Sequence, residues 1–119
     1  MSVILVYEDD LHLQELLIQV VRKEFTVCIG KNPQQMQEEV NEVGPALILL
    51  DNMMEADVAR EVLADYRAET PSPIPVVLFT AHANGASIAE YIGADDYIAK
   101  PFQLLELRRK LRELAKKGQ

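Results

Sequence analysis

Several polar side chains of this sequence each follow directly on a short apolar run. The acidic ones are Glu8, Asp9 and Asp51, and Thr80 and Lys100 stand in the same position further along the chain. Carboxylates that are brought close together repel one another and raise one another's pKa values, and a divalent cation removes that conflict. Oxygen ligands that leave room for water favour Mg²⁺. These residue types therefore predict a magnesium site, provided that the fold brings the side chains together.

The other residue types fit a phosphoryl group held beside the metal. Thr80 offers a hydroxyl donor and Lys100 a compact cation, and both suit phosphoryl oxygens. No serine, cysteine or histidine stands at the end of such a run, so Asp51 is itself the candidate nucleophile. A carboxylate can act in this way and become an aspartyl phosphate. Catalysis would then consist of positioning and charge neutralisation.

The apolar runs have the length and composition of strands that are buried on both faces of a parallel sheet. Five such strands are predicted, at residues 3–7, 25–29, 46–50, 76–79 and 96–99. Helices are predicted between and after them, with Asp10 and Asn32 as caps, the third at residues 58–69 and the fourth at 87–92. The first helix is expected to bury Leu13, Leu16, Leu17, Val20 and Val21, and the last Leu104, Leu107, Leu111 and Leu114.

Strands that alternate with helices predict right-handed crossovers and a parallel sheet covered on both faces. In open sheets of this kind the carboxyl ends of the strands line the crevice where ligands bind. A single aspartate at a strand end is more often a turn cap than a ligand. Here several strand ends present functional side chains to one place, and this convergence favours a binding site around Asp51.

Composition and charge narrow the class of protein. The chain has 119 residues, enough for one domain, and 49% of them are hydrophobic. A net charge of −7 argues against direct binding of nucleic acid. No stretch reaches the roughly 20 apolar residues that span a bilayer, and the start lacks the charged region of a signal peptide. Cys28 is expected to be a buried free thiol, and a cytoplasmic location follows.

Four motifs stand in order, each at a predicted strand end: residues 4–10, 49–54, 77–81 and 93–102. Together they resemble the receiver domain of two-component response regulators, and the resemblance covers the whole chain, residues 1–119. It implies an α/β fold of the flavodoxin-like, CheY-like type, a doubly wound (βα)5 parallel sheet with strand order 2-1-3-4-5. It also implies that the protein catalyses only its own phosphorylation and dephosphorylation.

The resemblance implies a role for each candidate residue. Asp51 would accept a phosphoryl group from a phosphohistidine on a sensor histidine kinase or a phosphotransfer protein. Asp9 and Asp51 would bind Mg²⁺ directly, and Glu8 would bind it through water. The remaining implied ligands are the backbone carbonyl of Met53 for the metal, and Thr80 and Lys100 for the phosphoryl oxygens.

Further implied roles concern switching and lifetime. Thr80 would move inward on phosphorylation and Tyr97 would change rotamer, altering the surface of the fourth helix, fifth strand and fifth helix for a downstream protein or a phosphorylation-dependent homodimer. Tyr97 fits a plain core position equally well. His82 and Met53 occupy positions that tune dephosphorylation, and an apolar Met53 predicts slow decay because it cannot orient water. The peptide bond between Lys100 and Pro101 is expected to be cis.

Two departures from the family pattern keep other readings open. Glu55 stands where a proline is usual, and the stretch from Thr80 to Lys100 is slightly shorter than usual. A degenerate receiver that binds proteins constitutively is therefore the main alternative. A Mg²⁺-dependent phosphohydrolase would carry its nucleophile at the end of the first strand with a second aspartate two residues later, and residues 8–10 do not match that pattern. A flavodoxin-like electron carrier would need a hydroxyl- and glycine-rich loop there, and the sequence has none. No effector domain follows residue 117, so we expect a stand-alone receiver or a piece of a longer chain.

Overall fold

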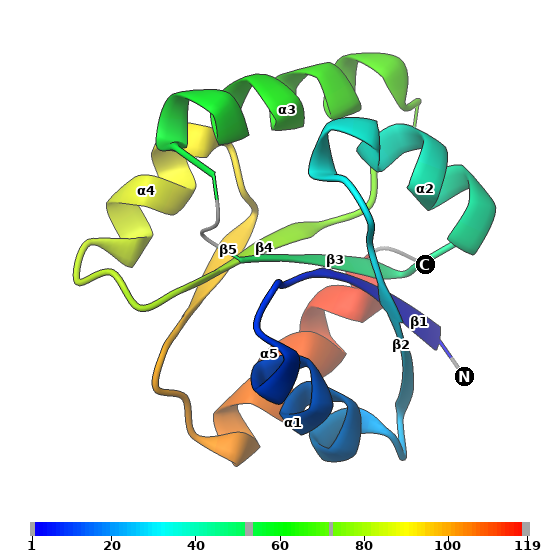
Figure 1. Cartoon of the computed structure of the whole chain (residues 1–119), viewed down its shortest axis with the longest axis vertical. Helices are drawn as coiled ribbons and strands as arrows, with labels where there is room; N and C mark the ends of the chain where they lie inside the picture. The colour runs from blue at the N-terminus through cyan, green and yellow to red at the C-terminus, as the bar shows by residue number, and fades with distance from the viewer. Residues whose placement is uncertain (1, 52–53, 72, 118–119) are drawn as a thin grey trace.

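The structure is a computed structural model that describes residues 2–51, 54–71 and 73–117. Its centre is a parallel sheet, which within these residues has the order β2-β1-β3-β4-β5 (Figure 1). The strands are β1 (Ser2–Tyr7), β2 (Phe25–Ile29), β3 (Leu47–Asp51), β4 (Val76–Thr80) and β5 (Asp96–Ala99). The order and the parallel pairing confirm the predicted doubly wound sheet.

The helices cover both faces of the sheet, as Figure 1 shows. They are α1 (Leu11–Val21), α2 (Met36–Val43), α3 (Ala56–Glu69), α4 (Gly85–Ile92) and α5 (Leu104–Lys117), with a short 3₁₀ turn η1 (Pro33–Gln35) before α2. One apolar cluster joins α1 and α5 to one face of the sheet, and a second joins α2, α3 and α4 to the other. Alternate residues of β1 enter opposite clusters, because successive side chains of a strand point to opposite faces.

The two predicted helix caps, Asp10 and Asn32, act where they were expected. Asp10 Oδ1 accepts the N–H groups of His12 and Leu13, which satisfies two donors at the start of α1. Asn32 caps η1 by accepting the N–H of Gln34. Gly44 ends α2 in the left-handed region, at φ 65°.

Some predictions of boundary and burial were wrong. Helices α3 and α4 begin at Ala56 and Gly85, two residues earlier than predicted. Leu16 is 43% exposed and Leu104 46% exposed, because Leu16 lies beside the buried stripe of α1 and Leu104 starts α5 before the helix reaches the sheet. Cys28 is a free thiol as predicted, but it is only half-buried, because β2 is an edge strand. Among the described residues, no helix is long and apolar enough to cross a membrane.

Candidate functional site

The acidic residues meet at the carboxyl ends of two neighbouring strands. Tyr7 of β1 pairs with Leu50 of β3, so the next residues, Glu8 and Asp51, lie side by side at this edge of the sheet. One carboxylate oxygen from each of Glu8, Asp9 and Asp51 lies within 4.8 Å of the others. Glu8 is only 4% exposed, Asp51 is half-buried and Asp9 is exposed. The strand ends thus form an acidic group that opens to solvent on the Asp9 side.

Lys100 brings a positive charge into this acidic group. Its Nζ lies 2.5 Å from Asp51 Oδ1 and 3.2 Å from Glu8 Oε1. The residue follows β5, and its backbone N–H donates to the carbonyl oxygen of Thr80 at 2.8 Å, which ties it to the end of β4. The Lys100–Pro101 peptide bond is cis, as predicted.

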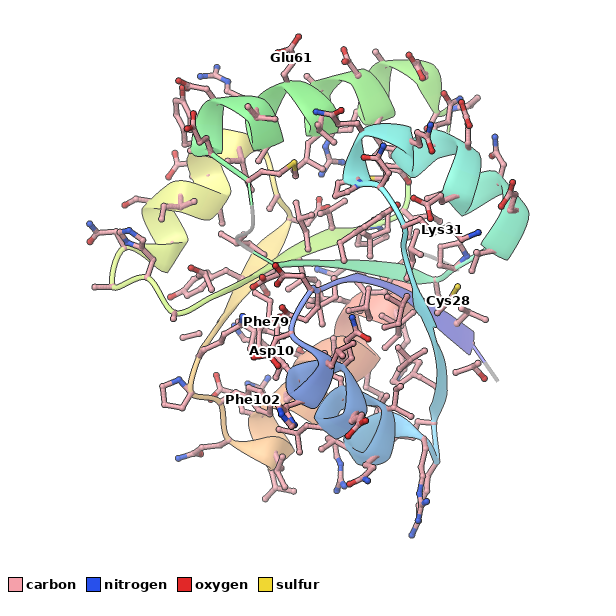
Figure 2. All side chains as sticks on the ribbon, in the orientation of Figure 1. Asp10, Cys28, Lys31, Glu61, Phe79 and Phe102 are labelled. Atoms are coloured by element: carbon pink, nitrogen blue, oxygen red, sulfur yellow. The ribbon has the colours of Figure 1, made fainter. Side chains whose placement is uncertain are left out.

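One phenylalanine lies against the lysine, and a second packs on the first. Lys100 Nζ lies 4.7 Å from the centre of the Phe79 ring, a favourable position for a cation over an aromatic face. The Phe79 and Phe102 ring centres are 5.4 Å apart, and both residues pack with the α1–α5 side of the sheet (Figure 2). The lysine stem is therefore fixed between the apolar core and the carboxylates.

Burial and neighbouring charges shift the pKa values of Glu8 and Lys100. Burial raises the pKa of Glu8, and hydrogen bonds from the Asp10 N–H and from Lys100 oppose that effect only in part. Burial alone would lower the pKa of Lys100. The hydrogen bonds and charges of Asp51 and Glu8 more than offset it, so the pKa of Lys100 is raised. The lysine is therefore fully charged at neutral pH.

Thr80 and Tyr97 lie next to the start of α4. Thr80 is fully buried at the end of β4, and its Oγ1 accepts the backbone N–H of His82 at 3.0 Å. A Cβ placed on Gly85 would lie 3.0 Å from the Tyr97 ring and 3.1 Å from Thr80 Cγ2. On the other side of Tyr97, Lys110 donates to its backbone carbonyl at 2.9 Å. The half-buried Tyr97 ring therefore lies close to Thr80, the residue that is expected to move on phosphorylation.

The structure thus brings most of the predicted residues together. Glu8, Asp9, Asp51 and Lys100 form one group, and Thr80 stands at the neighbouring strand end. The side chain of His82 is exposed. Met53 and its backbone carbonyl lie outside the described residues.

The donor set fits a magnesium ion. Its members are carboxylates, which are hard oxygen ligands, and Asp9 is open to solvent so that waters can complete an octahedral shell. Glu8, Asp9 and Asp51 would hold the ion. Lys100 offsets part of the negative charge of Glu8 and Asp51.

One support of the site was missed from the sequence. The Tyr7 hydroxyl donates to Glu39 Oε1 at 3.2 Å, and the Glu39 carboxylate also accepts the backbone N–H groups of Lys31 and Asn32. A Cβ on Gly30 would lie 2.2 Å from the Tyr7 ring, so only glycine fits there. Burial and the Glu39 carboxylate raise the pKa of Tyr7. The contact between Tyr7 and Glu39 could not be predicted, because nothing in the sequence around Glu39 distinguishes it from other acidic residues.

Comparison with known proteins decides the family. The model of the response regulator receiver domain matches residues 4–112. The chain belongs to this receiver family. Such domains are the signalling modules of two-component phosphorelays, and the predicted identity is confirmed.

Individual relatives agree with this assignment. The DNA-binding response regulator MtrA of Mycobacterium tuberculosis is 38% identical over 117 residues, which cover 92% of this chain and 48% of MtrA. The receiver domain thus spans about half the length of the curated relatives it matches. The N-terminal domain of the nisin resistance regulator NsrR superposes with a TM-score of 0.77 at 25% identity, covering 97% of this chain and 98% of that one.

A third likeness shows the fold alone. The receiver domain of Ssk1, in a co-crystal structure with the histidine phosphotransfer protein Ypd1 from Saccharomyces cerevisiae, has a TM-score of 0.76 at 23% identity. The match covers 97% of this chain and 89% of that one.

Proposed function

We propose that the whole chain acts as one receiver domain, which takes a phosphoryl group onto Asp51 from the phosphohistidine of a sensor histidine kinase or phosphotransfer protein. The observation that carries the proposal is the position of Asp51. Its carboxylate belongs to the acidic group with Glu8 and Asp9 and lies 2.5 Å from Lys100. A nucleophile with a cation on one side and metal-binding carboxylates on the other is suited to phosphoryl transfer.

The reaction forms one bond and breaks another. An oxygen of the Asp51 carboxylate attacks phosphorus, and the phosphorus–nitrogen bond of the donor histidine breaks. The electron pair of that bond leaves with the imidazole nitrogen. Bound Mg²⁺ would supply charge neutralisation for the phosphoryl oxygens. Glu8, Asp9 and Asp51 would hold that ion, and the three are already grouped without rearrangement of the strands.

Lys100 and Thr80 would bind the transferred group. Lys100 is held 3.2 Å from Glu8 and close to Asp51, so its charge faces the place where a phosphoryl oxygen would arrive. Thr80, at the neighbouring strand end, provides a hydroxyl for another oxygen. Groups fixed before the reaction need little reorganisation during it.

Phosphorylation would be read through α4, β5 and α5. Thr80 and the Tyr97 ring both pack against Gly85 at the start of α4, so a shift of Thr80 towards Asp51 changes the space available to Tyr97. A downstream protein, or a second copy in a phosphorylation-dependent homodimer, would recognise the altered surface. Met53 and His82 would set the lifetime of the phosphoryl group, and replacing Met53 with Asn would shorten it.

The test uses Mg²⁺, acetyl phosphate as a small phosphodonor, and the intact mass of the protein. We expect a gain of one phosphoryl group that requires Mg²⁺ and is lost in Asp51→Asn. Asp65→Asn, which neutralises an exposed carboxylate on α3, is the matched control and should behave like the wild type. Phosphorylation that persists in Asp51→Asn would contradict the assignment of Asp51.

The main alternative is a constitutive protein-binding module. Glu55 favours it, because this carboxylate stands exposed at the N-cap of α3, close in sequence to the acidic group. Absence of any mass gain, together with no binding of beryllofluoride as a phosphoryl mimic, would make this alternative the better account.

A further inference from the structure

The C-terminal end of α4 is attached to α3 by side-chain contacts. The Tyr91 hydroxyl donates to the carboxylate of Asp57, in the first turn of α3. The guanidinium carbon of Arg60 lies 4.7 Å from the centre of the Tyr91 ring, which is 44% exposed. One residue of α4 thus contacts two residues that lie a turn apart on α3.

A second fastening lies just beyond the end of α4. Arg67, in the last turn of α3, donates to the carbonyl oxygen of Gly93 at 2.8 Å and to Asp95 at 2.9 Å. The same Asp95 carboxylate accepts the backbone N–H of the buried Val76 at 2.7 Å. Arg67 therefore ties the C-terminal cap of α4 to α3, and Asp95 ties the following residues to the start of β4.

The opposite end of α4 is held differently. Asn84, at the N-cap, makes no capping hydrogen bond with its side chain, and the first helical residue is a glycine. Gly85 is buried against Tyr97 and Thr80, close enough that an added Cβ would crowd both. This end rests on the switch residues through packing, and its backbone has the conformational freedom of glycine.

We propose that α4 works as a lever whose pivot is Tyr91. Its C-terminal half stays on α3, and phosphorylation displaces only the N-terminal turn that rests on Thr80 and Tyr97. This inference rests on the proposed function, since it describes how the same site signals. A partner would then read the connection between β4 and α4 and the first turn of α4, residues 81–88, rather than the whole helix.

The contacts act together because the helix is short. Each is partly exposed and contributes modestly alone. The contacts of Tyr91 and those of Arg67 all lie at the C-terminal end of α4, which has only 8 residues. At that end, the Tyr91 side chain and the Gly93 carbonyl both contact α3. An element fastened at one end opens locally at the other end first.

Amide hydrogen exchange measured by NMR, with Mg²⁺ and with or without beryllofluoride, tests the lever. The Ile88 N–H donates to the backbone carbonyl of Asn84 at the N-terminal end of α4. The N–H groups of Gly93 and Ala94 donate to the carbonyl of Ala89 at the C-terminal end, which is attached to α3. We expect beryllofluoride to change the exchange rate of Ile88 by roughly fivefold or more and those of Gly93 and Ala94 by less than about twofold. In Tyr91→Leu combined with Arg67→Ala, the change should spread to Gly93 and Ala94.

The matched control is Glu90→Gln, an exposed neutralisation on α4 that should keep the wild-type pattern. Equal changes at Ile88 and Gly93 in the wild type would overturn the lever, as would a double variant in which Gly93 and Ala94 still do not respond. Tyr91→Phe combined with Arg67→Gln, a milder pair of changes at the same two attachments, serves if the first double variant does not fold, and there the same failure to respond overturns the lever. Binding is read separately from the amide shifts of Asp51 and Lys100. If these do not move, the proposed function itself fails, and the lever fails with it.

Discussion

Asp9 and Asp10 are adjacent in sequence, but their carboxylates face different structures. Asp10 Oδ1 lies 2.9 Å from the His12 nitrogen and 3.2 Å from the Leu13 nitrogen, at the start of α1. An oxygen of Asp9 instead lies within 4.8 Å of carboxylate oxygens of Glu8 and Asp51. The pair offers a test of the metal site in which one aspartate serves as the control for the other.

We expect Asp9→Ala and Asp10→Ala to separate metal binding from fold stability. Asp10→Ala should lower the free energy of unfolding by about 1 kcal/mol through loss of the cap, and should keep the stabilisation by Mg²⁺. Asp9→Ala should leave metal-free stability nearly unchanged and lose most of that stabilisation. In the wild type, Mg²⁺ should raise the free energy of unfolding by about 1.4 kcal/mol when its concentration is roughly tenfold above its dissociation constant. Urea unfolding with EDTA or Mg²⁺ measures both, and equal Mg²⁺ effects in the two variants would contradict the assignment.

Gly30→Ala should destabilise the protein, because the added Cβ would lie 2.2 Å from the Tyr7 ring. Overpacking of a core costs about 1–3 kcal/mol. The same change in a Tyr7→Val background should cost much less, since the ring is gone. Urea unfolding of the four proteins gives the coupling energy. If Gly30→Ala costs as much stability in the Tyr7→Val background as in the wild type, the clash with the Tyr7 ring is not its cause.

Alkaline pH should destabilise the fold through two buried tyrosines. Burial raises the pKa of both Tyr7 and Tyr66 above the unfolded value of about 10. As pH rises past that value, the unfolded chain loses phenolic protons that the folded chain keeps. The folded state then binds more protons, so stability falls with rising pH, by at most about 1.4 kcal/mol per pH unit for each tyrosine.

Tyr7→Phe should make that slope shallower, by an amount that grows with pH and approaches about one proton at about pH 11. Urea unfolding between about pH 9 and about pH 11 gives the slope, and tyrosinate absorbance reports ionisation directly. An identical slope in the variant would show that Tyr7 ionises in the folded state as readily as in the unfolded chain.

Asp95→Ala should cost more stability than Arg67→Ala, although the two residues form one ion pair. Arg67 and Asp95 are both partly exposed, so loss of the arginine should cost less than about 1 kcal/mol. Asp95 also accepts the N–H of fully buried Val76, which would lose its side-chain acceptor, at a cost of about 1–3 kcal/mol. Thermal or urea unfolding ranks the two, and the reverse order would contradict the role given to Asp95.

The sheet could be predicted from sequence because its strands are continuous apolar runs, and a carboxylate or lysine directly after such a run must stand at its end. This placed Asp51 and Lys100 at the same edge before any contact was known. Helix faces were harder to predict. Leu16 has the hydrophobicity and nearly the spacing of a buried residue, yet it is exposed, since a few tens of degrees around the helix decide burial.

Contacts between elements that are far apart in the chain left no local signal. Tyr91 and Asp57 are separated by 34 residues, and Tyr7 and Glu39 by 32, so their pairing depends on how the helices pack on the sheet. The sequence could suggest that α4 is unusual because it is short. The sequence could not show that α3 holds one end of α4. Arg60 and Arg67 do not differ in residue type or spacing from ordinary solvent-facing residues of an amphipathic helix.

The bond between Lys100 and Glu8 spans 92 positions of the chain. During synthesis, the carboxylates that follow β1 and end β3 are made before the lysine that neutralises them. Until β5 docks, the nascent chain holds mutually repelling acids without their cation. The proposed phosphoryl-accepting edge is therefore complete only after β5 has docked, so a chain that can be phosphorylated is one whose sheet is fully assembled.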